Sequence, residues 1–274
     1  MRAKQFFGLA VLAVLSIIAG CGGSSGDGGG GPTGGTGTMN IRLADAPDPT
    51  ITSIDLVFNK LEAKIGNSWQ EIPLADETVN LLDLTENDML LGSAVLPAGN
   101  YNQIRLFPSS ATVTDSDGTH NVNIGSAANT GIKVNINAEL VANAVQTLLL
   151  DFNVDKSLIK QGNGQYRLQP VLVGVIKTLS GTITGVATDG TDPLLNAQVT
   201  AVYEAGSSYP IGTEVNTSAS MSDGGFTIWA LLPGTYTLNF TWTSADGTVT
   251  KTAQMTGVVV EANEETSVGN VTLS

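Results

Sequence analysis

The sequence predicts an all-β protein with two antiparallel β-sandwich domains in tandem, after a signal peptide and a flexible glycine-rich linker. Two observations carry this prediction. Apolar residues recur at every second position, which is the period of a strand with one buried face. Turn-forming pairs such as Asp-Gly and Pro-Gly separate these runs. A helical period is absent except for one turn expected around residues 155–159.

Residues 1–20 show the order of charge, apolar core and small residues that is typical of a secretory signal. Arg2 and Lys4 precede an apolar run over residues 6–18. As a helix this run would cover about 20 Å, which is short of the ~30 Å hydrocarbon core of a bilayer. We therefore expect a signal peptide that is cleaved rather than a retained membrane span.

Cys21 follows Ala19 and Gly20 and is the only cysteine in 274 residues, so it has no intramolecular disulfide partner. The end of the leader resembles the bacterial lipoprotein signal. This resemblance implies that Cys21 carries fatty chains such as palmitate and anchors the protein to a lipid bilayer. Gly22 stands where the resemblance places Asp for inner-membrane retention, which favours the outer membrane, with a periplasmic or a surface-exposed body. The alternative is an ordinary secretory leader with an incidental cysteine.

Residues 21–38 are almost entirely Gly, Ser and Thr after the cysteine. The 17 residues that follow Cys21 should behave as a flexible tether with a reach of about 20–25 Å. Without the leader, ten basic residues (12 less Arg2 and Lys4) face 25 acidic ones, which gives a net charge of −15. This balance argues against nucleic acid and against anionic lipid headgroups as partners, because both bind basic patches.

The first domain is expected at residues 39–178. Strands with one inward face are predicted at 54–58, 132–137 and 147–152. Residues 166–176 are predicted as one longer strand, apolar on both sides in its second half like a central sandwich strand, with a bulge at Pro170. The Asp115 to Gly118 segment carries the signal of a β-hairpin turn.

Short motifs follow one another through this domain: Leu43-Ala44-Asp45-Ala46-Pro47, Trp69, Asn80-Leu81-Leu82-Asp83-Leu84, Leu96-Pro97-Ala98-Gly99-Asn100-Tyr101-Asn102-Gln103-Ile104-Arg105-Leu106, Thr130-Gly131-Ile132-Lys133, Leu150-Asp151-Phe152 and Lys156-Ser157. In this order they resemble a bacterial lipoprotein domain, the domain of unknown function 4382 (DUF4382). The resemblance covers essentially the whole domain and implies no established activity. Asn153 stands where the resemblance places a second acid after Asp151, which weakens a cation site built on that pair.

The second domain is expected at residues 179–274. Between Thr235 and Trp242, apolar residues alternate with polar ones, and the same pattern occupies residues 197–204. About seven short strands in about 96 residues is the spacing of a β-sandwich.

Four motifs follow in this half: Ser180-Gly181-Thr182-Ile183-Thr184-Gly185-Val186, Ala197-Gln198-Val199, Gly224-Gly225-Phe226 and Leu232-Pro233-Gly234-Thr235-Tyr236. Together they resemble the carboxypeptidase regulatory-like domain, a transthyretin-type sandwich. Met221 replaces the Asp that this family usually has before the glycine turn, which argues against a cation-linked turn there. The Leu-Pro turn also echoes the one at residues 96–101, and in both we expect the tyrosine to enter the next strand.

The chain is poor in the groups that catalysis needs. Its single histidine, His120, is predicted at an exposed strand end rather than as a general base. With Cys21 lipidated, no Cys/His pair remains for a nucleophile or for zinc. A carboxylate-based glycan-processing enzyme would need two acids about 5–10 Å apart in a cleft, and the sequence places no such pair. We therefore predict that the protein is not an enzyme.

No cofactor is predicted, and calcium is the alternative because oxygen ligands are plentiful. The candidate metal ligands are Asp45, Asp48, Asp151 and Asp155, which lack the spacing of a calcium-binding loop. Their competing role is to cap backbone amides in turns.

Trp229 is the candidate ligand-binding residue. If Phe226, Ile228 and Ala230 point inward, Trp229 points outward, where an indole can hold a sugar ring or a partner's apolar patch. In the competing arrangement the first domain or a loop covers Trp229. Trp69, by contrast, is expected to end a strand in the core. The sequence thus predicts a non-catalytic cell-envelope binding or assembly module for a glycan or an envelope protein. A purely structural spacer is a further alternative.

Overall fold

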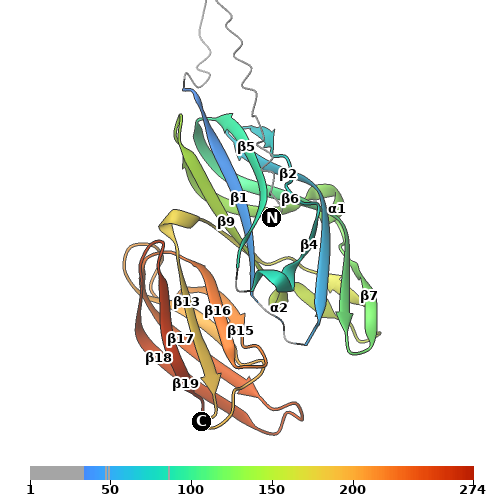
Figure 1. Ribbon diagram of the computed structural model, residues 1–274, viewed down its shortest axis with the longest axis vertical. Coiled ribbons are helices and arrows are strands. Elements are labelled where there is room, and N and C mark those ends of the chain that lie inside the picture. Colours follow the sequence, from blue (N-terminus) through green and yellow to red (C-terminus); the bar gives the residue numbers. More distant parts are fainter. Residues whose placement is uncertain (1–33, 47, 49, 86) are drawn as a thin grey trace, which may run out of the picture. The chain divides into compact units, whose positions relative to one another are not determined.

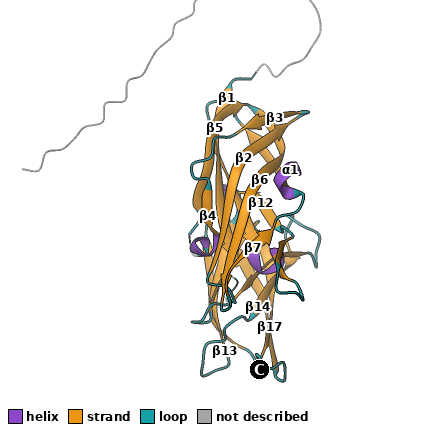
Figure 2. Cartoon of the chain, turned by 90° about the vertical axis from the view of Figure 1, so that its right-hand side faces the viewer, coloured by secondary structure: helices purple, strands orange, loops and turns teal. Residues whose placement is uncertain are grey.

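The computed structural model describes residues 34–274 apart from 47, 49 and 86 (Figure 1). The predicted leader, Cys21 and most of the tether lie outside the described residues. Figure 2 shows that the described chain is built almost entirely of strands, which confirms the all-β prediction. In this part of the chain, no helix has the length and apolar character needed to span a bilayer.

The first sandwich packs a four-stranded sheet, in the order β12-β9-β1-β5, on an eight-stranded sheet. The strands of the smaller sheet are β1 (Thr36–Ala46), β5 (Met89–Pro97), β9 (Val145–Asn153) and β12 (Leu172–Ile176). Thr36 pairs with Pro97, so β1 begins inside the segment that was expected to be tether.

The eight-stranded sheet has the order β10-β11-β7-β6-β2-β3, with β4 on β2 and β8 on β6. Its strands are β2 (Ser53–Ile65), β3 (Ser68–Glu71), β4 (Thr78–Asn80), β6 (Gly99–Asp115), β7 (Gly118–Asn123), β8 (Ile132–Leu140), β10 (Leu158–Lys160) and β11 (Tyr166–Leu168). Asp115 pairs with Gly118, which confirms the predicted hairpin. Four single-turn helices lie between strands: η1 (Leu81–Leu84), α1 (Ala127–Thr130), α2 (Val154–Ser157) and η2 (Lys177–Leu179).

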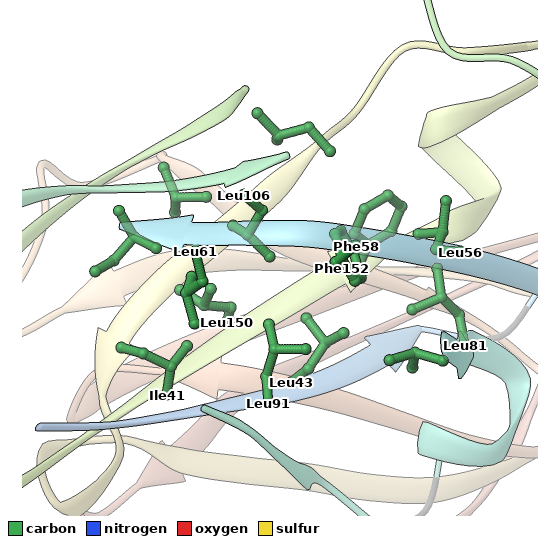
Figure 3. Packing of buried hydrophobic residues seen from close by; sticks show 14 of the residues in the cluster. Ile41, Leu43, Leu56, Phe58, Leu61, Leu81, Leu91, Leu106, Leu150 and Phe152 are labelled. Carbon is green, nitrogen blue, oxygen red and sulfur yellow. The ribbon is translucent and has the colours of Figure 1, made fainter. Parts of the chain in front are cut away.

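The core of the first sandwich lies between its two sheets. Figure 3 shows side chains from both sheets that point toward one another, all of them buried: Ile41, Leu43, Leu91, Leu150 and Phe152 from the smaller sheet, and Leu56, Phe58, Leu61 and Leu106 from the larger one. Removal of this apolar surface from water is the main force that holds the two sheets together.

The prediction of one strand over residues 166–176 is wrong. Pro170, which has no N–H group to donate, separates β11 from β12, and these two strands belong to different sheets. β12 is an edge strand rather than a central one. It is apolar on both sides because one side meets the core of the first sandwich while Val175 packs against Ala230 of the second.

The second sandwich packs a three-stranded sheet, β16-β13-β19, on a four-stranded sheet, β15-β14-β17-β18. Its strands are β13 (Gly181–Thr188), β14 (Gln198–Ala205), β15 (Glu214–Ala219), β16 (Gly225–Leu231), β17 (Gly234–Thr243), β18 (Thr250–Val260) and β19 (Glu265–Thr272). These strands agree with the seven that the turn spacing predicted. Of the four residues of β17 predicted to point inward, Tyr236, Leu238 and Phe240 are buried, and Trp242 is partly buried against the same core.

Three of the four described sheets are mixed, and only β15-β14-β17-β18 is purely antiparallel, which corrects one detail of the predicted fold class. β1 pairs with β9, β7 with β11, and β13 with β19 in parallel register. A local sequence pattern does not reveal this, because parallel partners are joined by long crossovers rather than by hairpins.

The two Leu-Pro turns have the same construction. The Tyr101 hydroxyl donates a hydrogen bond to the Pro97 carbonyl (2.8 Å), and the Tyr236 hydroxyl donates to the Leu232 carbonyl (2.6 Å). Each bond closes the turn from the following strand, as in the tyrosine corner of other sandwiches. Gly234 has a φ of 158°, and a Cβ atom there would lie 2.4 Å from the Tyr203 ring, so this turn requires glycine.

Candidate functional site

Trp229 lies where the second sandwich contacts the first. Its indole Nε1 donates a hydrogen bond to the Thr85 carbonyl (3.2 Å). The ring packs against an apolar cluster that joins the sandwiches: Ala44, Leu149, Val173 and Val175 from the first, and Ala230 and Leu232 from the second. The structure therefore shows the arrangement in which the first domain covers Trp229, and the indole is only partly exposed.

A β-bulge in β16 adds Ala230 to the side of the strand that carries Trp229. Ala230 has a positive φ of 59°, and the register with β13 shifts between Gly181 and Ile183. Two successive residues of β16, Trp229 and Ala230, consequently face the first sandwich. Strict alternation, on which the sequence prediction depended, holds through Trp229 and fails at Ala230, which was predicted to point inward.

Polar side chains extend this contact. Asn216 of β15 donates from Nδ2 to Asp151 Oδ2 (2.6 Å) and to the Trp229 carbonyl (2.8 Å). Asn153 donates from Nδ2 to the Thr217 carbonyl and hydroxyl, each at 2.9 Å. The residue that departs from the DUF4382 pattern, Asn153, thus serves as a hydrogen-bond donor to the second sandwich.

The carboxyl group of Asp151 lies in this contact and has a raised pKa. It is buried, and its Oδ1 accepts no hydrogen bond from the described part of the chain. Burial raises the pKa of its carboxyl group from 3.8 to about 6, although the hydrogen bond from Asn216 acts in the opposite direction. At neutral pH the folded protein therefore holds an ionised carboxylate with one hydrogen-bond donor.

The other predicted metal ligands are distributed around α2. Asp45 Oδ1 accepts a hydrogen bond from the Val154 N–H (3.2 Å), and Asp48 Oδ1 accepts one from the Thr50 N–H (2.9 Å). Burial and the nearby charge of Asp48 raise the pKa of Asp155. Within the described residues, no three His, Cys, Asp or Glu side chains form a group that could hold a metal ion. Of the four aspartates, Asp151 and Asp155 have partners in the second sandwich, whereas Asp45 and Asp48 accept hydrogen bonds within the first.

His120 belongs to a cluster around Asp115. Asp115 accepts hydrogen bonds from Lys160 Nζ (2.7 Å), the Tyr166 hydroxyl (2.5 Å) and His120 Nε2 (3.1 Å), with the last bond depending on the histidine tautomer. The bonds from Lys160 and Tyr166 hold the pKa of Asp115 well below its usual range. This carboxylate stays ionised at neutral pH, so the cluster ties the β6–β7 hairpin to β10 and β11 rather than offering a free base.

Trp69 is not a core residue, which corrects the sequence prediction. It pairs with Lys64 across β2 and β3, and both side chains lie on the outer face of the larger sheet because Ala63 points into the core. Trp69 is partly exposed, and the Arg105 guanidinium stacks on its ring. Trp69 follows the short turn Gly66-Asn67 between β2 and β3. The sequence around this turn does not show on which face of the sheet the Trp69 ring lies.

A groove of about 660 Å³ runs along β8 and β12. Five successive residues of each strand line it, 133–137 and Leu172–Ile176, together with Leu179, Tyr209 and Leu232. Both strands are edges: in the described chain β8 pairs only with β6, and β12 only with β9. A Cβ atom on Gly174 would lie 2.8 Å from Val134 Cγ1, so this glycine permits the close approach of the two strands.

Replacing Trp229 with alanine should destabilise the protein. We expect Trp229→Ala to lower the free energy of unfolding by roughly 2–3 kcal/mol, because a large ring leaves a partly buried contact. Trp229→Phe, which keeps most of the packing and loses the bond to Thr85, should cost about 1 kcal/mol. Thermal and urea unfolding measure both variants. Wild-type stability of Trp229→Ala would contradict the contact.

Asp151 should make stability depend on pH. Its pKa is raised on folding, so the folded state binds more protons than the unfolded state between pH 3.8 and about 6, and stability falls as pH rises through this window. Asp151→Asn removes the charge and keeps an acceptor for Asn216. We expect it to raise stability at pH 7 by up to about 3 kcal/mol and to have little effect near pH 4.

Urea unfolding at several pH values tests this expectation. Asp192→Asn, which removes an exposed carboxylate, is the matched control. An equal effect of Asp151→Asn at pH 4 and pH 7 would show that the charge of Asp151 does not matter.

The family model described as "Domain of unknown function (DUF4382)" matches residues 36–170. No curated protein matches the chain. The resemblance of residues 179–274 to the carboxypeptidase regulatory-like domain stays a prediction, although a sandwich is present there.

Solved structures resemble the chain only weakly. The TIE protein of Bacillus anthracis is 16% identical with a TM-score of 0.26, over 87% of this chain and 34% of that chain. BcpA, the major pilin subunit of Bacillus cereus, is 12% identical with a TM-score of 0.24, over 86% and 69%. A mutant of the shaft pilin SpaA from Lactobacillus rhamnosus GG is 13% identical with a TM-score of 0.24, over 87% and 98%.

The chain spans about a third of the TIE protein, and none of these TM-scores is high enough to support an argument about function. The family match is different, because it includes every motif that suggested the family in the first domain and agrees with the boundaries of β1 and β11. Residues 36–170 of this chain are therefore a DUF4382 domain.

Proposed function

We propose that this protein is a lipid-anchored lipoprotein of the bacterial outer membrane that acts without catalysis as an assembly module, by binding an extended segment of another envelope protein. Cys21 carries the anchor in this proposal, and residues 22–35 are the tether. The single observation that supports the binding mode is the groove between the edge strands β8 and β12.

Two unpaired strand edges favour an extended segment as the ligand. Each edge presents a row of backbone N–H and C=O groups along one side, and a strand laid beside it forms the missing hydrogen bonds. Five residues line the groove on each strand, which corresponds to a segment of roughly 17 Å. Because both edges line one groove, a single segment can pair with one strand while its side chains contact the other.

The residues that line the groove indicate which kinds of side chain the partner segment should have. Val173, Tyr209 and Leu232 make one side apolar, and Leu179 is 51% exposed beside them. On the β8 side, Lys133, Asn135 and Asn137 are exposed and polar. A segment with alternating apolar and polar or acidic residues would match both sides.

The alternatives have less support. A carboxylate-based enzyme needs a pair of accessible acids, whereas Asp45 and Asp151 are both buried. A purely structural spacer gives no reason for an apolar groove along two open edges. A glycan ligand is favoured by a different surface, the outer face of the larger sheet around Trp69.

Removal of the anchor cysteine tests the localisation. We expect Cys21→Ser to leave a soluble or leader-bearing form, because no thiol remains to accept the lipid. Membrane fractionation and intact-mass analysis of the mature chain measure this. Unchanged fractionation together with the absence of an acyl mass on wild-type Cys21 would refute the anchor.

Short synthetic peptides from envelope proteins, chosen for alternating apolar and polar residues, test the groove on the full-length protein in detergent. We expect binding peptides to slow amide hydrogen exchange in 133–137 or 172–176, and we expect backbone N-methylation of the peptide to abolish binding, because the donors for strand pairing are lost.

The matched variants are Leu179→Asp in the groove and Val95→Asp on the edge strand β5, whose side chains are 51% and 68% exposed. Only Leu179→Asp should weaken peptide binding, by about tenfold. Peptides that bind both variants equally, or that protect amides elsewhere, would exclude the groove.

A further inference from the structure

The outer face of the larger sheet carries two rows of side chains across β3, β2, β6 and β8. The strand register sets these rows, because directly paired residues point to the same face. One row is Glu71, Glu62, Arg105 and Lys133, and the next is Trp69, Lys64, Gln103 and Asn135. Charged, amide and aromatic groups therefore lie beside one another on a single sheet surface.

Arg105 is the centre of this surface. Its guanidinium carbon lies 4.0 Å from the centre of the Trp69 ring and 4.8 Å from that of Phe107. Its Nε and Nη2 donate hydrogen bonds to Glu62 Oε2 at 3.0 and 2.6 Å. The stacked cation fixes the orientation of the indole ring.

The groups around Arg105 hold it in one position. Glu62 is buried and also pairs with Lys60 (2.5 Å), and although burial acts to raise its pKa, the bonds from Lys60 and Arg105 lower it overall. Gly131 has a φ of 71°, and a Cβ atom there would lie 2.3 Å from Arg105 Cγ. The Arg105 stem thus packs over a position that only glycine leaves open.

Lysines without an ion-pair partner flank this rigid stack. In the described part of the chain, neither Lys64 nor Lys133 forms an ion pair. With Lys60 and Arg105 they make four of the twelve basic residues of the chain. A chain of net charge −13 thus gathers positive charge beside an aromatic ring and two amides.

We propose that this surface, named here the Trp69 face, binds an acidic polysaccharide. A sugar ring stacks on the exposed side of Trp69, Gln103 and Asn135 bond to hydroxyl groups, and Lys64 and Lys133 pair with carboxylates of the sugar chain. Lys64 is on β2 and Lys133 on β8, with β6 between them, so the two lysines are about 10 Å apart across the sheet. This spacing suits a polymer that carries a negative charge at regular intervals.

Charge complementarity selects this ligand class. A neutral glycan would use the ring and the amides but would leave both lysines without a partner. The acidic remainder of the chain repels an anionic polymer, so electrostatics directs such a polymer to the Trp69 face. The Trp69 face and the groove share Lys133 and Asn135 of β8, whereas Trp69, Lys64 and Gln103 do not line the groove, so variants of these three residues separate the two ligands.

Binding of polygalacturonate to the full-length protein in detergent tests the proposal, with dextran as the neutral polymer. We expect polygalacturonate to bind and to weaken with added salt, because exposed charges are screened. Trp69→Ala and the double variant Lys64→Gln, Lys133→Gln should each weaken binding about tenfold or more. Lys251→Gln, in the second sandwich, and Trp242→Phe should bind as the wild type does.

Trp69→Ala also removes a stacking partner of Arg105, so thermal unfolding accompanies each measurement. If Trp69→Ala fails to fold, Lys64→Gln alone decides, because Lys64 does not line the groove and makes no ion pair in the described chain. Three outcomes would overturn the proposal: no binding of polygalacturonate, equal binding of dextran, or wild-type binding by the folded lysine variants.

Discussion

Burial of both faces of β9 is the constraint on which the rest of the structure depends. Leu148, Leu150 and Phe152 fill the first core, whereas Leu149 and Asp151 face the second sandwich. A strand with one solvated face would leave the two sandwiches independent. Instead β9 and its neighbour β12 contribute to both the first core and the inter-sandwich contact, and β12 forms one side of the groove.

This constraint explains the raised pKa of Asp151. The contact excludes water around its carboxyl group, and such shifts often mark catalytic sites. Here the neighbours are Asn216, which donates a hydrogen bond to Asp151, and apolar residues of the two sandwiches. The accessible features lie elsewhere, at a strand edge and on a sheet face.

Trp229 and Trp69 both lie in surroundings that differ from those predicted from the sequence. Trp229 was a candidate for an outward platform and does point away from its own core, but the first sandwich covers it. Trp69 was expected in the core, but its pairing with Lys64 places it on the outer face. Alternation predicts that a residue leaves its own core, yet it does not say whether another domain covers it.

The sequence by itself determined the class of the fold, the hairpin at Asp115, the seven strands of the second half and the family of residues 36–170, because these depend on local periods, turn residues and motif order. Only the tertiary structure decided that Pro170 separates two sheets, that β1 and β9 run parallel, and that Arg105 stacks between Trp69 and Phe107. These contacts join residues that are distant in the chain, and their partners are selected by packing and register rather than by neighbouring residues.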